Sequence, residues 1–251
     1  MLRGGLPHAD APFDDFSTCL SIVLTWTGVA LLGAAGGVAI RWVSARTDSL
    51  GRPRPFPYVS VVAFSLLGLM AIAPFVLRVR LEGRLAAAAS ELVGAGVEVR
   101  CQSFGGAFVD AGTDLGYVAY GADGVPERRT LIKREQCGDL SDYLRSDKEH
   151  PTSEQIIAVH VLTHEAVHMS GVRSEAETEC EAVQRNAQMA QLLGASREAA
   201  ARLSVAYWRE VYPRMPDAYR SEECTLGGAL DAGRSDAPWM LPTGQTEPGQ
   251  P

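Results

Sequence analysis

The chain has 251 residues, of which 30 are acidic and 23 are basic, and its formal net charge is −7. The length allows one domain of ordinary size together with a smaller element. The acidic balance excludes a general nucleic-acid-binding protein, because such proteins neutralise phosphates with an excess of basic residues. We therefore expect no nucleic acid among the partners of this chain.

The first third of the chain is typical of a membrane hairpin. After a polar tail at residues 1–18, charged residues are absent from 16–40 and again from 55–77. Each stretch exceeds the roughly 20 residues that a helix needs to cross a bilayer. A signal peptide is the alternative for the first stretch, but its start would be basic and this one is acidic. We expect transmembrane helices at 19–41 and 57–78 and a connecting loop at 42–56, with the lipid bilayer as a partner.

Two further patterns bear on this hairpin. Gly33 and Gly37 are spaced so that they permit close helix contact. Arg41 and the three arginines of the connecting loop stand against one aspartate, whereas the tail carries one arginine. The positive-inside rule therefore places the loop in the cytoplasm and both ends outside, in a cell membrane crossed twice. Three arginines shortly after the second stretch argue the other way: Arg78, Arg80 and Arg84.

Cysteine placement provides a separate indication of compartment. Cys19 stands at the membrane edge, and the other four cysteines all follow the second apolar stretch. An even set there is typical of disulfides in an oxidising compartment, and four buried thiols in a cytosolic domain are the alternative. Three pairings are possible. We favour Cys101–Cys137 and Cys180–Cys224, because each joins neighbouring segments.

Short strands and helices follow one another after the second stretch, which predicts an α+β domain over residues 79–225. Its expected parts are an alanine-rich helix at 81–93, strands at 97–101, 117–120 and 130–133, a helical turn at 139–143, and three main helices at 153–169, 174–193 and 196–212. Residues 226–251 are rich in glycine, proline and polar residues, so we expect them to be disordered.

The first main helix contains the motif H-E-x-x-H, formed by His164, Glu165 and His168. Residues four apart share a helix face, so both imidazoles can bind one zinc ion. Glu165 stands next to the first ligand, where a carboxylate can hold and deprotonate a zinc-bound water. A purely structural zinc site would fill its fourth position with a side chain and would not need that carboxylate. The motif therefore indicates a catalytic Zn2+.

A catalytic zinc needs a third protein ligand. His160 extends the ladder of histidines, but three rings along one helix cannot converge tetrahedrally on one ion. The next helix is the nearest source of a ligand, and Glu175 lies closest to the turn that precedes it. Glu179 shares its face and is expected to accept a hydrogen bond from a ligand histidine, or to be the alternative ligand. Glu177 and Glu181 are expected to face solvent.

This pattern resembles the zincin metallopeptidases, especially the gluzincin type, which places H-E-x-x-H on one helix and E-x-x-x-D/E on the next. It is also similar to two-span membrane proteins of actinobacteria with H-E-x-x-H and a following E-x-x-x-E-C, over about residues 95–225. The resemblance implies that His164, His168 and Glu175 bind zinc, that Glu165 is the general base and that Glu179 supports a ligand. The spacing from His168 to Glu175 is shorter than in thermolysin-like gluzincins.

The resemblance implies a zincin-like domain and a membrane-anchored metallopeptidase that hydrolyses a peptide or protein substrate. The substrate would pair with an edge strand beside the site, and we expect residues 130–133 to be that strand. Five residues are candidate donors to the transition-state oxyanion: His150, His160, Tyr207, Tyr212 and Tyr219. The alternative function is a non-catalytic, membrane-anchored zinc-binding sensor or interaction module with the same fold.

Overall fold

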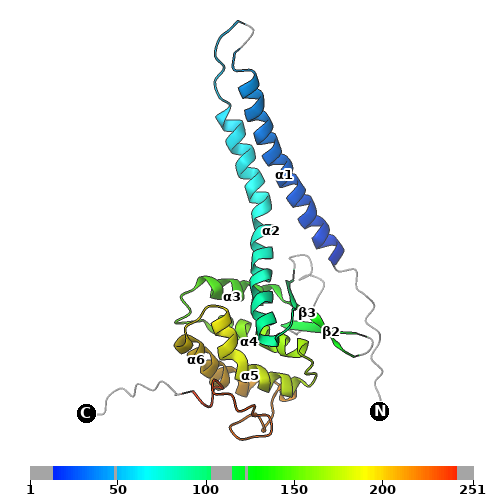
Figure 1. Cartoon of the computed structure of the whole chain (residues 1–251), viewed down its shortest axis with the longest axis vertical. Coiled ribbons are helices and arrows are strands. Elements are labelled where there is room, and N and C mark those ends of the chain that lie inside the picture. Colours follow the sequence, from blue (N-terminus) through cyan, green and yellow to red (C-terminus); the bar gives the residue numbers. More distant parts are fainter. Residues whose placement is uncertain (1–13, 48–49, 103–114, 122–123, 242–251) are drawn as a thin grey trace, which may run out of the picture. The chain divides into compact units, whose positions relative to one another are not determined.

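The structure is a computed structural model that describes residues 14–47, 50–102, 115–121 and 124–241. It divides into two units, each considered by itself (Figure 1). The first unit comprises the chain up to Arg80 with residues 103–109, and the second comprises Leu81–Gln102 with the chain from Asp110 onward. The whole is a mostly helical α+β protein with one small sheet, in agreement with the expected class.

The first unit is built from two long helices, α1 (Asp14–Ser44) and α2 (Tyr58–Val93), of which α2 belongs to this unit up to Arg80 and continues into the second. By length and composition, both are apolar enough to cross a membrane, and little of their apolar surface is buried. They cover the two expected spans. The expected separate helix at 81–93 is the last part of α2, because residues 78–93 contain no proline and their alanines favour an uninterrupted helix.

Helices α1 and α2 approach each other closely at two glycines. A Cβ atom on Gly28 would lie 2.9 Å from the carbonyl oxygen of Gly68, and one on Gly68 would lie 2.9 Å from that of Gly28. Only glycine lets the two backbones approach so closely. Gly33 and Gly37 take no part, since added Cβ atoms there would meet nothing within 4 Å among the described residues.

The second unit contains a sheet of β1 (Glu98–Cys101), β2 (Gly116–Tyr120) and β3 (Pro126–Ile132). Its order is β1-β3-β2, with β1 parallel and β2 antiparallel to β3. The prediction that residues 130–133 form an edge strand is therefore wrong, because the backbone of β3 pairs on both sides. The alternation of side chains shows which face of a strand is buried, but it does not show which neighbours the strand has.

Four helices follow the sheet and pack on one another in chain order: α3 (Arg134–Arg145), α4 (Ser153–Met169), α5 (Glu175–Leu192) and α6 (Arg197–Ala206) (Figure 1). The expected turn at 139–143 is the middle of the longer helix α3. Helix α4 contacts α3, α5, β2 and β3, which explains why 13 of its residues are buried. A π-helical turn, η2 (Tyr207–Val211), follows α6, and two 3-10 turns come next, η3 (Tyr212–Arg214) and η4 (Asp217–Tyr219).

Local sequence fixes both ends of α4 and the start of α5. Thr152 and Gln155 form the reciprocal capping box expected from the sequence. Gly171 has φ of +114°, a conformation that side chains with a Cβ rarely adopt, and it reverses the chain between the two helices. The side chain of Ser174 then caps α5 by accepting a hydrogen bond from the backbone of Glu177. The turn thus brings the start of α5 back against the end of α4.

Two disulfides hold the second unit together, and both predicted pairings are confirmed. Cys101–Cys137 joins β1 to α3 across 36 residues, and Cys180–Cys224 joins α5 to the C-terminal segment across 44 residues. All four cysteines are buried. Bridges of such loop length typically stabilise a domain by about 2–4 kcal/mol.

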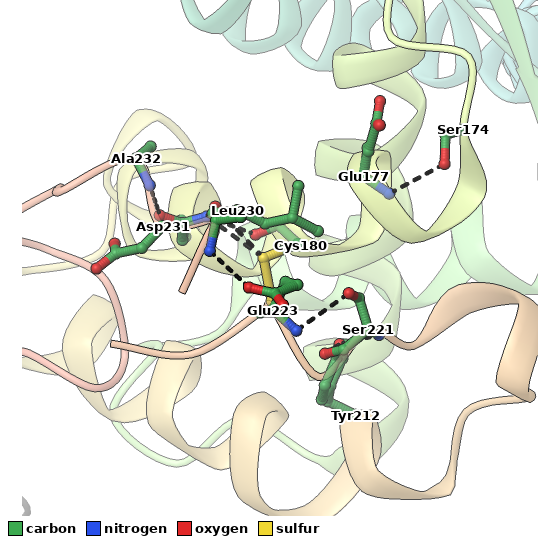
Figure 2. The surroundings of a disulfide bond; sticks show 12 residues. Ser174, Glu177, Cys180, Tyr212, Ser221, Glu223, Leu230, Asp231 and Ala232 are labelled. Carbon is green, nitrogen blue, oxygen red and sulfur yellow. Dashed lines mark hydrogen bonds between the residues drawn. A yellow bond between two sulfur atoms is a disulfide. The ribbon is translucent and has the colours of Figure 1, made fainter. Parts of the chain in front are cut away.

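The expected disorder of 226–251 is wrong for residues 226–241, which lie against the second unit. The side chain of Gln184 donates to the carbonyl of Leu230 at 2.9 Å and accepts from the amide of Ala232 at 2.8 Å. Trp239 packs against the core. Figure 2 shows these turns beside the disulfide at Cys180. The polar composition did not predict this order, because the contacts that hold the segment come from the Cys180–Cys224 disulfide and from Gln184. Residues 242–251 lie outside the described part of the chain.

The two bridges provide a matched pair of variants. We expect Cys180→Ser/Cys224→Ser to lower the free energy of unfolding by about 2–4 kcal/mol and to expose residues 226–241 to protease. Cys101→Ser/Cys137→Ser should destabilise the unit to a similar degree but leave that segment protected. Denaturant unfolding followed by limited proteolysis and mass mapping measures both effects. Equal protease sensitivity in the two variants would contradict the anchoring role of Cys180–Cys224.

Candidate metal centre

Helix α4 carries the three histidines of the ladder on one buried face. His160, His164 and His168 are 3%, 8% and 6% exposed, and Glu165 is 5% exposed. Because the helix repeats every 3.6 residues, the three rings follow one another along its length. The first turns of α5 lie opposite and provide the carboxylates that face them.

Three atoms from α4 and α5 converge on one point. Oε2 of Glu175 lies 3.2 Å from Nε2 of His164 and 3.3 Å from Nε2 of His168. All three atoms lie within 4.8 Å of one another. Ligand atoms about 2.0 Å from a tetrahedral zinc ion are roughly 3.3 Å apart, so this nitrogen and oxygen set fits zinc in both chemistry and spacing. The structure thus brings together the three residues expected to be ligands.

The other ring nitrogens of the two histidines are held by acceptors. Nδ1 of His168 donates to the carbonyl of Val172 at 2.9 Å, and Nδ1 of His164 donates to Oε2 of Glu179 at 3.0 Å. A proton fixed on Nδ1 leaves the lone pair of Nε2 for a metal. Such acceptors orient ligand imidazoles in zinc sites. Glu179 therefore accepts a hydrogen bond from the second ring nitrogen of His164, the contact that was expected of it.

Glu179 is fully buried and belongs to a larger hydrogen-bonded network. Its Oε2 also accepts from Nε2 of His160 at 2.9 Å, while its Oε1 accepts from the hydroxyl of Tyr207 at 2.7 Å. The amide nitrogen of Asn186 lies 3.0 Å from Nδ1 of His160, and the ring of Tyr207 stacks on that histidine with centroids 3.7 Å apart. His160, His164 and Glu179 are also close enough to hold a metal. We assign them a supporting role, because their separations of 2.9 and 3.0 Å are ordinary hydrogen-bond lengths.

Glu165 faces the sheet. Its Oε2 lies 3.5 Å from the hydroxyl of Thr130 in β3. A Cβ atom on Gly116 in β2 would lie 2.9 Å from Oε1 of Glu165, so glycine leaves the space that this carboxylate fills. Neither Gly116 nor Thr130 was predicted from the sequence. A glycine at the start of a strand and a buried threonine carry no pattern that distinguishes them from other strand residues.

Burial and hydrogen bonding set the charges of these groups. Burial raises the pKa of Glu165 to about 7. Burial alone would lower the pKa of His164, but its hydrogen bonds with Glu175 and Glu179 outweigh this and raise it to about 9. The two histidines lower the pKa of Glu175 to about 2. Burial would raise the pKa of Glu179, but His160 and His164 lower it. Without metal, the site therefore pairs ionised carboxylates with protonated imidazole.

Among the residues that the structure describes, one side of the centre is exposed at Glu175. The side chain of Glu175 is 43% exposed, in contrast to the buried imidazoles. Tyr120 of β2 places its hydroxyl 3.2 Å from Nδ1 of His168, and the ring of Tyr219 lies 5.9 Å from that of His164 between centroids. Tyr219 is the expected oxyanion donor that the structure places beside the ligands, whereas Tyr120 was not predicted.

The other predicted donors are engaged or lie elsewhere. His160 and Tyr207 belong to the Glu179 network. The hydroxyl of Tyr212 donates to the carbonyl of Ser221, and His150 stands on an exposed segment before α4. On α5, Glu177 is exposed and Glu181 pairs with Arg185 at 2.7 Å, as expected of solvent-facing acids.

Comparisons with protein-family models, with curated proteins and with solved structures find no match to this chain.

The Glu179 network leads to a graded prediction. We expect Glu179→Ala to weaken zinc binding by about 10–100-fold, because His164 would lose the acceptor that orients its ring. Glu177→Ala removes the same group two residues away on the exposed face and should leave the affinity unchanged. Competition with a fluorescent zinc chelator measures both variants. Equal zinc affinity in Glu179→Ala and the unmodified chain would show that His164 needs no such support.

Proposed function

We propose that this chain is a membrane-anchored, zinc-dependent metallopeptidase with a zincin-like domain. One observation carries the proposal: His164, His168 and Glu175 direct three ligand atoms at one point, with the Glu165 carboxylate beside them. The helix pair and the small sheet agree with a zincin-like arrangement. A purely structural metal site would have no use for a buried carboxylate that binds none of the ligands.

Zinc bound by these three residues would supply a Lewis acid and lower the pKa of a water molecule. Glu165 then acts as the general base, accepting a proton from the attacking water and passing it to the leaving amine. In the site without metal, burial raises the pKa of the Glu165 carboxyl, and this favours its uptake of a proton. Gly116 and Thr130 hold the carboxylate in place, and the exposed side at Glu175 admits the substrate.

We further propose that the peptide substrate lies along β2 and not along residues 130–133. Among the strands that the structure describes, β2 ends the sheet on the side of the metal centre. Its Gly116 and Tyr120 stand beside Glu165 and His168, respectively. A substrate extended along this strand would bring a peptide bond to the exposed side, where Tyr219 is the proposed oxyanion donor.

The direct experiment uses the full chain in detergent with a mixed peptide library. We propose cleavage that stops when zinc is removed by a chelator and returns when zinc is restored. The non-catalytic sensor makes a different prediction, since it would bind zinc with no cleavage of any peptide. Mass spectrometry of the products distinguishes the two functions and reports cleavage specificity.

For the membrane hairpin, we propose that the connecting loop is cytoplasmic and that the second unit lies outside the cytoplasm. The arginines of the loop and the two disulfides support this orientation.

Reporter fusions provide the topology test. A fusion at Gly51 should report a cytoplasmic position, and one at Gly227 an extracytoplasmic position. A cytoplasmic report from Gly227 would reverse the assignment without affecting the metal chemistry.

A further inference from the structure

The described residues on the two sides of positions 48–49 pair with each other between α1 and α2. The amide of Arg54 donates to the carbonyl of Arg46 at 2.8 Å, and Thr47 and Pro53 form an antiparallel bridge. These contacts hold the two arms of the segment side by side. Residues 48–49 lie outside the described part of the chain and take no part in the argument.

Trp42, near the end of α1, contacts the residues that precede α2. Its indole Nε1 donates to the carbonyl of Arg54 at 3.0 Å. Its ring meets Phe56 edge to face at 5.0 Å, and Phe56 meets Tyr58 in the same way at 4.6 Å. Aromatic rings with a polar edge are typical of the level of the lipid headgroups. The cluster thus joins the ends of two apolar helices, where a membrane surface would lie.

Three arginines lie next to the aromatic cluster of Trp42, Phe56 and Tyr58 in space or in sequence. The guanidinium of Arg46 lies over the Trp42 ring, 5.4 Å from its centroid. Arg54 is the hydrogen-bonded neighbour of Arg46, and Arg41 directly precedes Trp42. All three arginines are exposed, and none forms an ion pair with a residue that the structure describes. The three arginines therefore place positive charge next to the aromatic cluster.

We propose that this segment binds the phosphate of an anionic lipid headgroup through Arg46 and Arg54, assisted by Arg41. A guanidinium presents a planar fork of donors that matches phosphate oxygens. The backbone pairing holds Arg46 and Arg54 next to each other, and the Trp42 ring contacts the Arg46 guanidinium, so part of the site is ordered before the lipid binds, which lowers the entropy cost of binding. The site is separate from the metal centre and does not depend on the proposed peptidase activity.

The test uses the full chain in neutral detergent and native mass spectrometry, with short-chain phosphatidylglycerol and phosphatidylcholine titrated separately. We expect tighter binding of the anionic lipid. Arg46→Gln/Arg54→Gln should weaken it by roughly 10–30-fold, given the typical contribution of each basic residue at an anionic surface. Arg128→Gln/Arg129→Gln is the matched control, because it removes two exposed charges from β3 in the other unit.

Three results would overturn the proposal: equal affinity for the two lipids, an equal loss in the control variant, or unchanged binding in Arg46→Gln/Arg54→Gln. Displacement of the lipid by millimolar inorganic phosphate would also overturn it, because the site would then recognise free phosphate and not the membrane. Circular dichroism of each variant confirms that the helices are intact, so that a loss of binding reports on the arginines.

Discussion

Glu165→Gln is expected to keep zinc and to lose peptide hydrolysis by at least about 100-fold, the lower range for removal of a general base. The amide has the same shape and can still bond a water molecule, but it cannot accept its proton. Because Glu165 is not among the three converging ligand residues, the metal should remain. Zinc per chain and the rate of peptide cleavage, measured on the same preparation, test both parts.

Glu177→Gln is the control for this substitution. It makes the same chemical change on an exposed residue of α5, and both zinc content and cleavage should be unaffected. Cleavage by Glu165→Gln at the rate of the unmodified chain would remove Glu165 from the mechanism. Loss of zinc in that variant would instead make Glu165 a ligand.

His164→Ala and His168→Ala are each expected to empty the metal centre, since each removes one of three protein ligands. Glu175→Ala should weaken zinc binding strongly for the same reason. His150→Ala is the control, because it removes an imidazole from an exposed segment. Elemental analysis after dialysis against buffer without zinc gives the zinc content of each variant.

A comparison of the two glutamates of α5 decides between the alternative ligands. If Glu179→Ala emptied the site and Glu175→Ala left it filled, the assignment of the third ligand would be wrong by one helical turn. The structure favours Glu175, because its oxygen faces both Nε2 atoms, whereas Glu179 faces Nδ1 of His164.

Helix periodicity and capping made the core of the site predictable. The four-residue spacing placed His164 and His168 on one face of α4. Gly171, with its positive φ, and the cap at Ser174 placed Glu175 at the start of the returning helix. These features are local in sequence, which is why the three converging residues could be proposed before the fold was known.

Contacts made across the fold could not be predicted in this way. The position of Gly116 against Glu165 depends on how β2 pairs with β3 and where α4 lies on the sheet, and no local pattern encodes either. The same holds for β3, which was predicted as a strand but not in its central position. Residues 226–241 looked disordered because their order depends on anchors at Cys180 and Gln184, far away in sequence.

His160 illustrates a third case. Its place in the ladder suggested a metal ligand, and geometry argued against three rings on one ion. The structure shows why a histidine at this position is useful: buried between Tyr207 and Asn186, it donates to the carboxylate that supports His164. A residue that matches a ligand pattern can thus stabilise a site without reaching its centre.

The most direct test of the account is X-ray absorption spectroscopy at the zinc edge on the full chain, with the metal content of the same sample. The account predicts one zinc per chain, coordinated by two imidazoles and oxygen ligands that include a carboxylate. The Glu179→Ala variant, loaded with excess zinc, should show the same ligand set. A chain that binds no zinc would contradict the proposed zinc centre. Loss of imidazole coordination in the His160→Ala variant would also contradict it, because His160 would then be a zinc ligand.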